Sequence, residues 1–350
     1  MTVRLTGKQL LGLLLVLVLI GVTVSGVIRA SNLRSSSREG SPTTVLHQAS
    51  ASFLSANPVQ GERFRILWHI EPSIPPLVQA RMKSDAAVLE ARFGSKGRGV
   101  LFQPIVFTSS EWALAQVREL KVPSWITADF TNPTGTFGNP HPCSGYLNGF
   151  SDPWAISYSP QAPDLTSAIT VFDLSCSVHR GELLDNEDSL VQHEMTHVLQ
   201  YFGWAPPSGG IGSCIPAFII EGQAQFVEAM LAPGKTGDTM AAREANWYRF
   251  QSYGDTAQFS MTEAAIASNK RSSAAYSDGA AAVQYLVAHH GWPTFLRLFS
   301  TPLSEDCGRT NALGNATFER LFQSTFGQSI AQFEGAVKPY LREMHQNSGV

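Results

Sequence analysis

Short apolar runs and longer amphipathic segments alternate through the first part of the chain. The short runs predict β-strands at residues 63–70, 99–109, 154–159 and 168–176. The longer segments predict helices at residues 75–94, 110–120 and 188–203, while residues 121–153, full of Pro, Gly and Asn, predict a long loop. Pro104 favours an edge position or a bulge for its strand, because proline has no N–H to donate to a sheet.

The pattern changes after residue 203, where amphipathic segments follow one another without strands between them. They predict helices at about residues 217–231, 239–251, 273–290, 293–300, 317–325 and 329–345. Two boundaries are clear: Ser329 and Gln332 form a capping-box pattern, and Gly291 ends a helix before Pro293. We therefore expect an α+β fold. An N-terminal α/β lobe with a mixed sheet would span residues 61–204, and a helical lobe residues 205–345.

The N-terminal segment is apolar and uncharged over residues 9–28, and about twenty such residues can cross a bilayer as a helix. Arg4 and Lys8 precede it, as in a secretory signal, but cleaved signals usually have a shorter apolar core. We favour an uncleaved signal-anchor within residues 1–30, with a cleaved signal as the alternative. Residues 31–60, rich in Ser, Pro, Gln and Ala, predict a linker with a short helix near 43–54.

The composition is that of a globular protein, with 43% hydrophobic and 15% charged residues among 350. A net charge of −3 and the lack of any long basic run argue against a nucleic-acid partner. Behind a membrane-targeting segment, an even number of cysteines is compatible with two disulfides, and free buried cysteines are the alternative. These cysteines are Cys143, Cys176, Cys214 and Cys307, and no C-x-x-C spacing supports a thiolate metal site.

The candidate chemistry begins at "VQHEMTHVLQ", residues 191–200. His193 and His197 stand four residues apart, which places both rings on one face of a helix and within reach of one ion. Glu194 lies about 100° around the helix, where it could take a proton from a metal-bound water. Two histidines on a helix also occur without a metal, so the pair needs a third ligand.

The sequence offers a third ligand in the apolar helix "AFIIEGQAQFVEAM", residues 217–230. Glu221 follows four apolar or aromatic positions, and burying its charge would be costly unless it meets a cation. Glu228 comes two turns later on the same face, where it could accept the second ring N–H of a ligating histidine. A solvated glutamate is the alternative for Glu228. The residues thus predict one Zn²⁺ ion held by His193, His197 and Glu221.

H-E-x-x-H followed by a helix that carries E-G-x-A resembles the gluzincin metallopeptidases, the thermolysin and aminopeptidase relatives with a peptidase-MA-like domain. The resemblance covers roughly residues 150–345 and implies a zincin-like domain of two lobes with the active-site helix at their seam. It implies zinc ligation by His193, His197 and Glu221, with Glu194 as the catalytic base. "AAYSDGAAAVQYLVAHHG", residues 274–291, resembles the Y-x-x-G-A helix of these enzymes, and Tyr276 would then support the oxyanion. A tyrosine that only packs at the start of a helix is the alternative.

The hypothesis from the sequence is a single-pass, membrane-anchored zinc metallopeptidase with an extracytoplasmic catalytic domain, secreted if the N-terminal segment is cleaved. Its partners would be a peptide or protein substrate and, through residues 9–28, the lipid bilayer. The chain has no G-A-M-E-N stretch before the motif helix, which argues against an aminopeptidase. The alternative is a catalytically inactive zincin-fold protein that serves as a binding or scaffold protein at the membrane surface.

Overall fold

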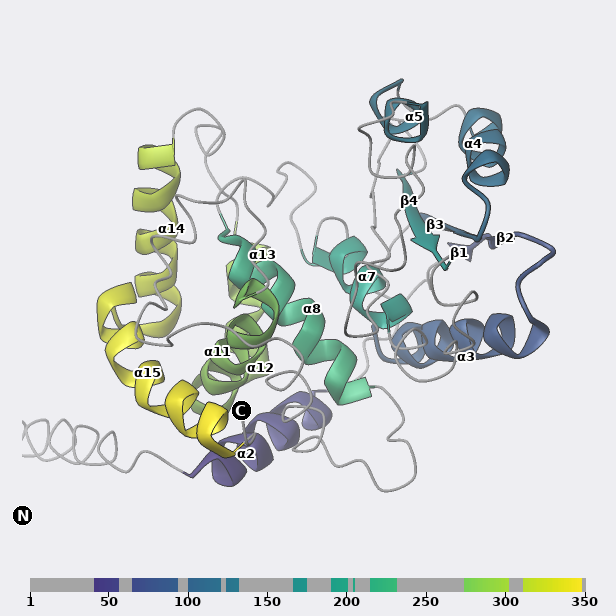
Figure 1. Cartoon of the computed structure of the whole chain (residues 1–350). Helices are drawn as coiled ribbons and strands as arrows, with labels where there is room; N and C mark the ends of the chain where they lie inside the picture. The colour runs from purple at the N-terminus through teal and green to yellow at the C-terminus, as the bar shows by residue number, and fades with distance from the viewer. Residues whose placement is uncertain are drawn as a thin grey trace, which may run out of the picture. The chain divides into compact units, whose positions relative to one another are not determined.

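The structure is a computed structural model that describes residues 41–56, 65–93, 100–120, 124–131, 166–174, 190–200, 204, 215–231, 274–301 and 311–347. Apart from Ser41, these residues belong to one compact unit, Pro42–Val350. The described part is mostly helical with a small sheet (Figure 1). The predicted strand at 154–159, the predicted helix at 239–251 and the four cysteines lie outside it.

The sheet is built around one central strand, β3 (Val100–Phe107). Strand β4 (Thr166–Asp173) pairs with β3 along its whole length, and β1 (Arg65–Ile66) and β2 (His69–Ile70) pair with its other edge. All of these pairings are parallel. The expected mixed sheet requires an antiparallel strand, which none of the described strands supplies.

The expected edge position of Pro104 is wrong, because β3 has neighbours on both sides. Ile66 pairs with Phe102 and His69 pairs with Ile105, so the break between β1 and β2 falls beside Pro104. Proline offers no N–H to a neighbouring strand, which accounts for a break at this point. One predicted strand at residues 63–70 is therefore present as two short ones.

Both faces of the sheet are covered, as is usual for parallel strands. Phe102, Val106 and Phe172 belong to the main apolar core, together with residues of α3 (Pro76–Phe93) and α7 (Leu190–Val198). The opposite face forms a smaller core with α4 (Ser110–Glu119) and α5 (Ser124–Thr131). The loop expected over residues 121–153 is wrong at residues 124–131, which form α5, and the rest of that range lies outside the described residues. The ring of Phe130 packs against the buried ring of Phe107, a partner that the local sequence does not reveal.

The remaining helices lie close to their predicted positions. They are α8 (Ala217–Leu231), α11 (Ala274–His290), α12 (Trp292–Phe295), α13 (Arg297–Ser300), α14 (Asn311–Phe326) and α15 (Ile330–Asn347). The capping box is confirmed, since Ser329 and Gln332 exchange side-chain to backbone hydrogen bonds of 2.8 and 3.2 Å. Gly291 has a φ of 82° directly after α11, as a helix-ending glycine often does.

The short helix expected near residues 43–54 is present as α2 (Pro42–Ser55), but it is part of the core rather than of a linker. Val45, Ala49 and Phe53 are fully buried on one face of α2, which packs against α11. The hydroxyl of Ser52 accepts a hydrogen bond from the backbone N–H of Trp292 at 2.8 Å. Residues 42–55 are therefore held by partners far along the chain.

None of the helices in the described ranges is long and apolar enough to span a membrane. The predicted anchor at residues 9–28 lies outside those ranges.

Candidate metal centre

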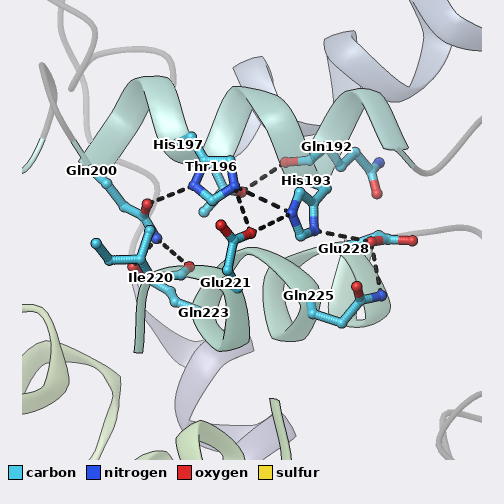
Figure 2. Close-up of polar contacts among 10 residues, drawn as sticks. All are labelled: Gln192, His193, Thr196, His197, Gln200, Ile220, Glu221, Gln223, Gln225 and Glu228. Atoms are coloured by element: carbon cyan, nitrogen blue, oxygen red, sulfur yellow. Dashed lines mark hydrogen bonds and ion pairs between the residues drawn. The ribbon is translucent and has the colours of Figure 1, made fainter. Parts of the chain in front are cut away.

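Helices α7 and α8 bring His193, His197 and Glu221 together (Figure 2). The two Nε2 atoms lie 3.2 Å apart. Oε2 of Glu221 lies 3.3 Å from Nε2 of His193 and 3.2 Å from Nε2 of His197. Three possible ligand atoms thus form a nearly equilateral triangle, two from one helix and one from another.

The local sequence explains why these side chains are held inside the protein. Val191, Met195 and Val198 anchor α7 in the main core, and α8 contributes Phe218, Ile219 and Val227 to the same core. The polar residues between them are carried inward, and only 3% of His193 and 8% of Glu221 is exposed. Buried groups of this kind need polar partners or an ion.

Each histidine has a partner at its other ring nitrogen. Nδ1 of His193 lies 3.5 Å from Oε2 of Glu228, which also accepts a hydrogen bond of 2.9 Å from the amide of Gln225. Nδ1 of His197 lies 2.8 Å from Oε1 of Gln200. Both partner atoms are acceptors, so each Nδ1 carries a proton, and in the neutral ring each Nε2 has the lone pair.

When both rings are neutral, two imidazole lone pairs and a carboxylate oxygen converge within 3.3 Å of one another. Three acceptors repel each other at this distance unless a positive charge lies among them. A divalent cation supplies that charge, and imidazole with carboxylate is a donor set that transition metals favour. The arrangement therefore fits a metal ion.

The proton affinity of the histidines points the same way. Burial lowers the pKa of His193, but Glu221, Glu228 and Glu194 outweigh it and raise the pKa to about 10. Burial also lowers the pKa of His197, and the charge of Glu221 raises it above its ordinary value. The pKa of Glu221 lies below its ordinary value because the two histidines outweigh its burial. Without a metal, the site takes up positive charge as protons.

Glu194 and Tyr276 lie at the same site. Glu194 is 5% exposed, and its negative charge contributes to the raised pKa of both histidines. The half-buried ring of Tyr276 stacks on the ring of His193, with 5.8 Å between the centroids and 22° between the planes. The structure thus brings six residues together that the sequence analysis singled out: His193, Glu194, His197, Glu221, Glu228 and Tyr276.

A close crossing of two helices positions Tyr276. Gly222 of α8 and Gly279 of α11 meet backbone to backbone, and a Cβ at Gly222 would lie 2.8 Å from the Cα of Gly279. A Cβ at Gly279 would lie 2.5 Å from the carbonyl oxygen of Phe218. Gly222 directly follows the ligand candidate Glu221, and Gly279 lies one turn after Tyr276. The two glycines therefore let α11 approach the site.

Gln200 is a residue at this site that the sequence analysis did not single out, and so are its partner Gln223 and the partner of Glu228, Gln225. The sequence does place Gln200 near His197, because a residue three positions later lies one turn further along the same helix face. A glutamine has no preference for this task over many others, so the spacing alone did not distinguish it from a polar surface residue.

Comparison with protein-family models, with curated proteins and with solved structures gave no match for this chain.

Proposed function

We propose that this protein is a zinc-dependent metallopeptidase in which His193, His197 and Glu221 hold one Zn²⁺ ion. The observation that carries the proposal is the triangle of two imidazole nitrogens and one carboxylate oxygen, with sides of 3.2, 3.3 and 3.2 Å. For a tetrahedral zinc ion with bonds of about 2.0–2.1 Å, neighbouring donors lie about 3.3 Å apart. Three protein ligands and one position for water are the usual plan of a catalytic zinc site.

The residues around the triangle support peptide hydrolysis rather than a purely structural ion. When bound, the ion polarises a carbonyl and lowers the pKa of a water molecule. Glu194 acts as the general base: its carboxylate takes a proton from the attacking water and passes it to the leaving amine. The hydroxyl of Tyr276 donates a hydrogen bond to the oxyanion that forms at the carbonyl. Glu228 holds His193 through Nδ1.

The substrate in this proposal is a peptide or a protein. The enzyme is attached to the cell membrane by residues 9–28, with its catalytic part on the extracytoplasmic side, or is secreted if that segment is cleaved. The support for this attachment is the uncharged apolar segment and the basic residues before it.

The test compares the full chain, purified in a mild detergent, with its Glu194→Gln variant. Zinc content and hydrolysis of casein are measured side by side. We expect about one equivalent of zinc in both proteins, because Glu194 is not a ligand, and a loss of hydrolysis of roughly 10²–10⁴-fold in the variant. A Glu343→Gln variant serves as the matched control, since this glutamate is exposed on α15, and it should behave as the wild type.

A wild-type protein without zinc would contradict the proposal. Full hydrolysis by Glu194→Gln would contradict the role of the base. Zinc in both proteins with hydrolysis in neither would favour the alternative, an inactive binding or scaffold protein.

A further inference from the structure

The side chain of Gln200 joins the two helices that carry the ligand candidates. Its Oε1 lies 2.8 Å from Nδ1 of His197 on α7. Its Nε2 donates to the carbonyl oxygen of Ile220 on α8 at 2.9 Å and to Oε1 of Gln223 at 2.8 Å (Figure 2). Gln200 is 1% exposed and Gln223 is fully buried, so water does not compete for these bonds.

These contacts decide which way the amide of Gln200 points. The carbonyl of Ile220 can only accept a hydrogen bond, so it must face the NH₂ group of Gln200. The oxygen of Gln200 then faces His197, and an oxygen can only accept. Nδ1 of His197 must therefore carry a proton, and in the neutral ring Nε2 presents its lone pair toward His193 and Glu221.

The same bonds fix the distance between two ligand candidates. Ile220 directly precedes Glu221, so Gln200 ties the ring of His197 to the backbone next to the third ligand. Leu199 and Gln200 continue α7 in a wider, π-helical turn, and the carbonyl of Leu199 accepts a hydrogen bond from the N–H of Trp204 at 2.7 Å. Single turns of this kind within helices often occur at functional sites.

Gln200 and Glu228 also differ in charge. Three carboxylates already surround the histidines, from Glu194, Glu221 and Glu228. A glutamine orients His197 without burying a fourth negative charge beside the histidines, which would be costly to desolvate.

We propose that Gln200 is a positioning residue of the metal centre: it sets the tautomer of His197 and holds this histidine in register with Glu221. This inference rests on the metal binding in the proposed function. A purely structural role, in which Gln200 only fastens α7 to α8, would affect stability but not the affinity for metal.

The experiment compares Gln200→Met with Gln192→Met in the full chain, in detergent. Methionine has a similar length but offers no hydrogen bond of comparable strength. Gln192 is the matched control, because it is a fully buried glutamine of α7, the helix that Gln200 follows, and its amide donates to the backbone of Asp85 on α3 at 3.2 Å. The readouts are the zinc dissociation constant by chelator competition, the visible spectrum with Co²⁺, and the unfolding temperature of the metal-free protein.

We expect Gln200→Met to weaken zinc binding about 10–100-fold and to change the Co²⁺ spectrum. Gln192→Met should lower the unfolding temperature of the metal-free protein but leave both metal readouts as in the wild type. Gln200→Met with wild-type zinc affinity and a lower unfolding temperature would overturn the inference and leave a structural role. A wild-type protein that binds no zinc would overturn the proposed function itself, so the two failures are distinguishable.

If Gln200→Met does not fold, a second variant tests the positioning role of Gln200. Gln223→Met removes one of the two acceptors that orient the amide of Gln200 and leaves Gln200 in place. It should weaken zinc binding about 2- to 10-fold, as expected for one lost hydrogen bond. An unchanged zinc affinity would overturn the inference.

Discussion

The ring and the hydroxyl of Tyr276 have separate tasks in the proposed site. The ring stacks on His193 at a centroid distance of 5.8 Å and covers one side of a ligand candidate. The hydroxyl is the part that would meet the oxyanion. Because phenylalanine keeps the ring and lacks the hydroxyl, one substitution separates the packing of Tyr276 from its chemistry.

We predict that Tyr276→Phe lowers kcat for casein hydrolysis about 10²-fold, as the loss of one oxyanion donor does in other enzymes. Zinc content and KM should stay close to those of the wild type, because the stacked ring remains. Steady-state kinetics and metal analysis of the purified variant provide the measurement. Tyr285→Phe is the control, since Tyr285 lies on the same helix but packs against His289 and Tyr340. Unchanged kcat in Tyr276→Phe would show that the hydroxyl has no part in the reaction.

Among the helices, the crossing of α8 and α11 is the contact that brings Tyr276 on α11 close to the candidate metal centre. Both helices carry a glycine at the contact, so their backbones approach more closely than side chains normally permit. Glycine inside a helix costs about 0.5–1 kcal/mol relative to alanine. At Gly222 and Gly279 this cost is offset by the packing that the close approach makes possible.

We predict that Gly222→Ala destabilises the protein by about 1–3 kcal/mol, because the new Cβ has no space beside Gly279. Hydrolysis should also fall, since α11 must move and carries Tyr276 with it. Gly335→Ala is the matched control: this glycine lies within α15, and an added Cβ would have nothing within 4 Å. That variant should gain about 0.5–1 kcal/mol. Denaturant unfolding measures both, and equal stability of the two variants would count against a tight crossing.

For the whole compact unit, α2 is the element that joins distant parts of the sequence. Phe53 packs edge to face against Phe93 of α3, Phe226 of α8 and Trp292 of α12, at centroid distances of 5.8, 5.7 and 5.0 Å. The guanidinium of Arg92 lies over the ring of Phe53 and donates to its backbone carbonyl. The first described helix therefore closes a core built from both parts of the chain.

We predict that Phe53→Ala destabilises the protein by about 3–5 kcal/mol, through lost burial and the cavity left among aromatic rings. Leu54→Ala is the control on the same helix, because Leu54 is 57% exposed, and its effect should stay within about 0.5 kcal/mol. Denaturant unfolding of the two variants gives the comparison. Similar, small effects for both would mean that residues 42–55 act as the linker that their composition suggests.

The sequence by itself determined what depends on neighbours along the chain. Helical spacing placed His193 and His197 on one face, and the capping box and Gly291 marked boundaries that the structure has. Glu221 followed from the cost of a charge in an apolar helix, and Glu228 from its position two turns later on the same face. Such features repeat every few residues, so local periodicity and local chemistry are enough to find them.

The tertiary structure alone decided what depends on residues far apart. It placed Oε2 of Glu221 within 3.3 Å of both histidines, and Gln200 between His197 and the carbonyl of Ile220. It placed Pro104 in a central strand, and it placed α2, a helix expected within a linker, in the core. These outcomes arise because burial and hydrogen bonding depend on which elements meet, and a local pattern does not specify the partner.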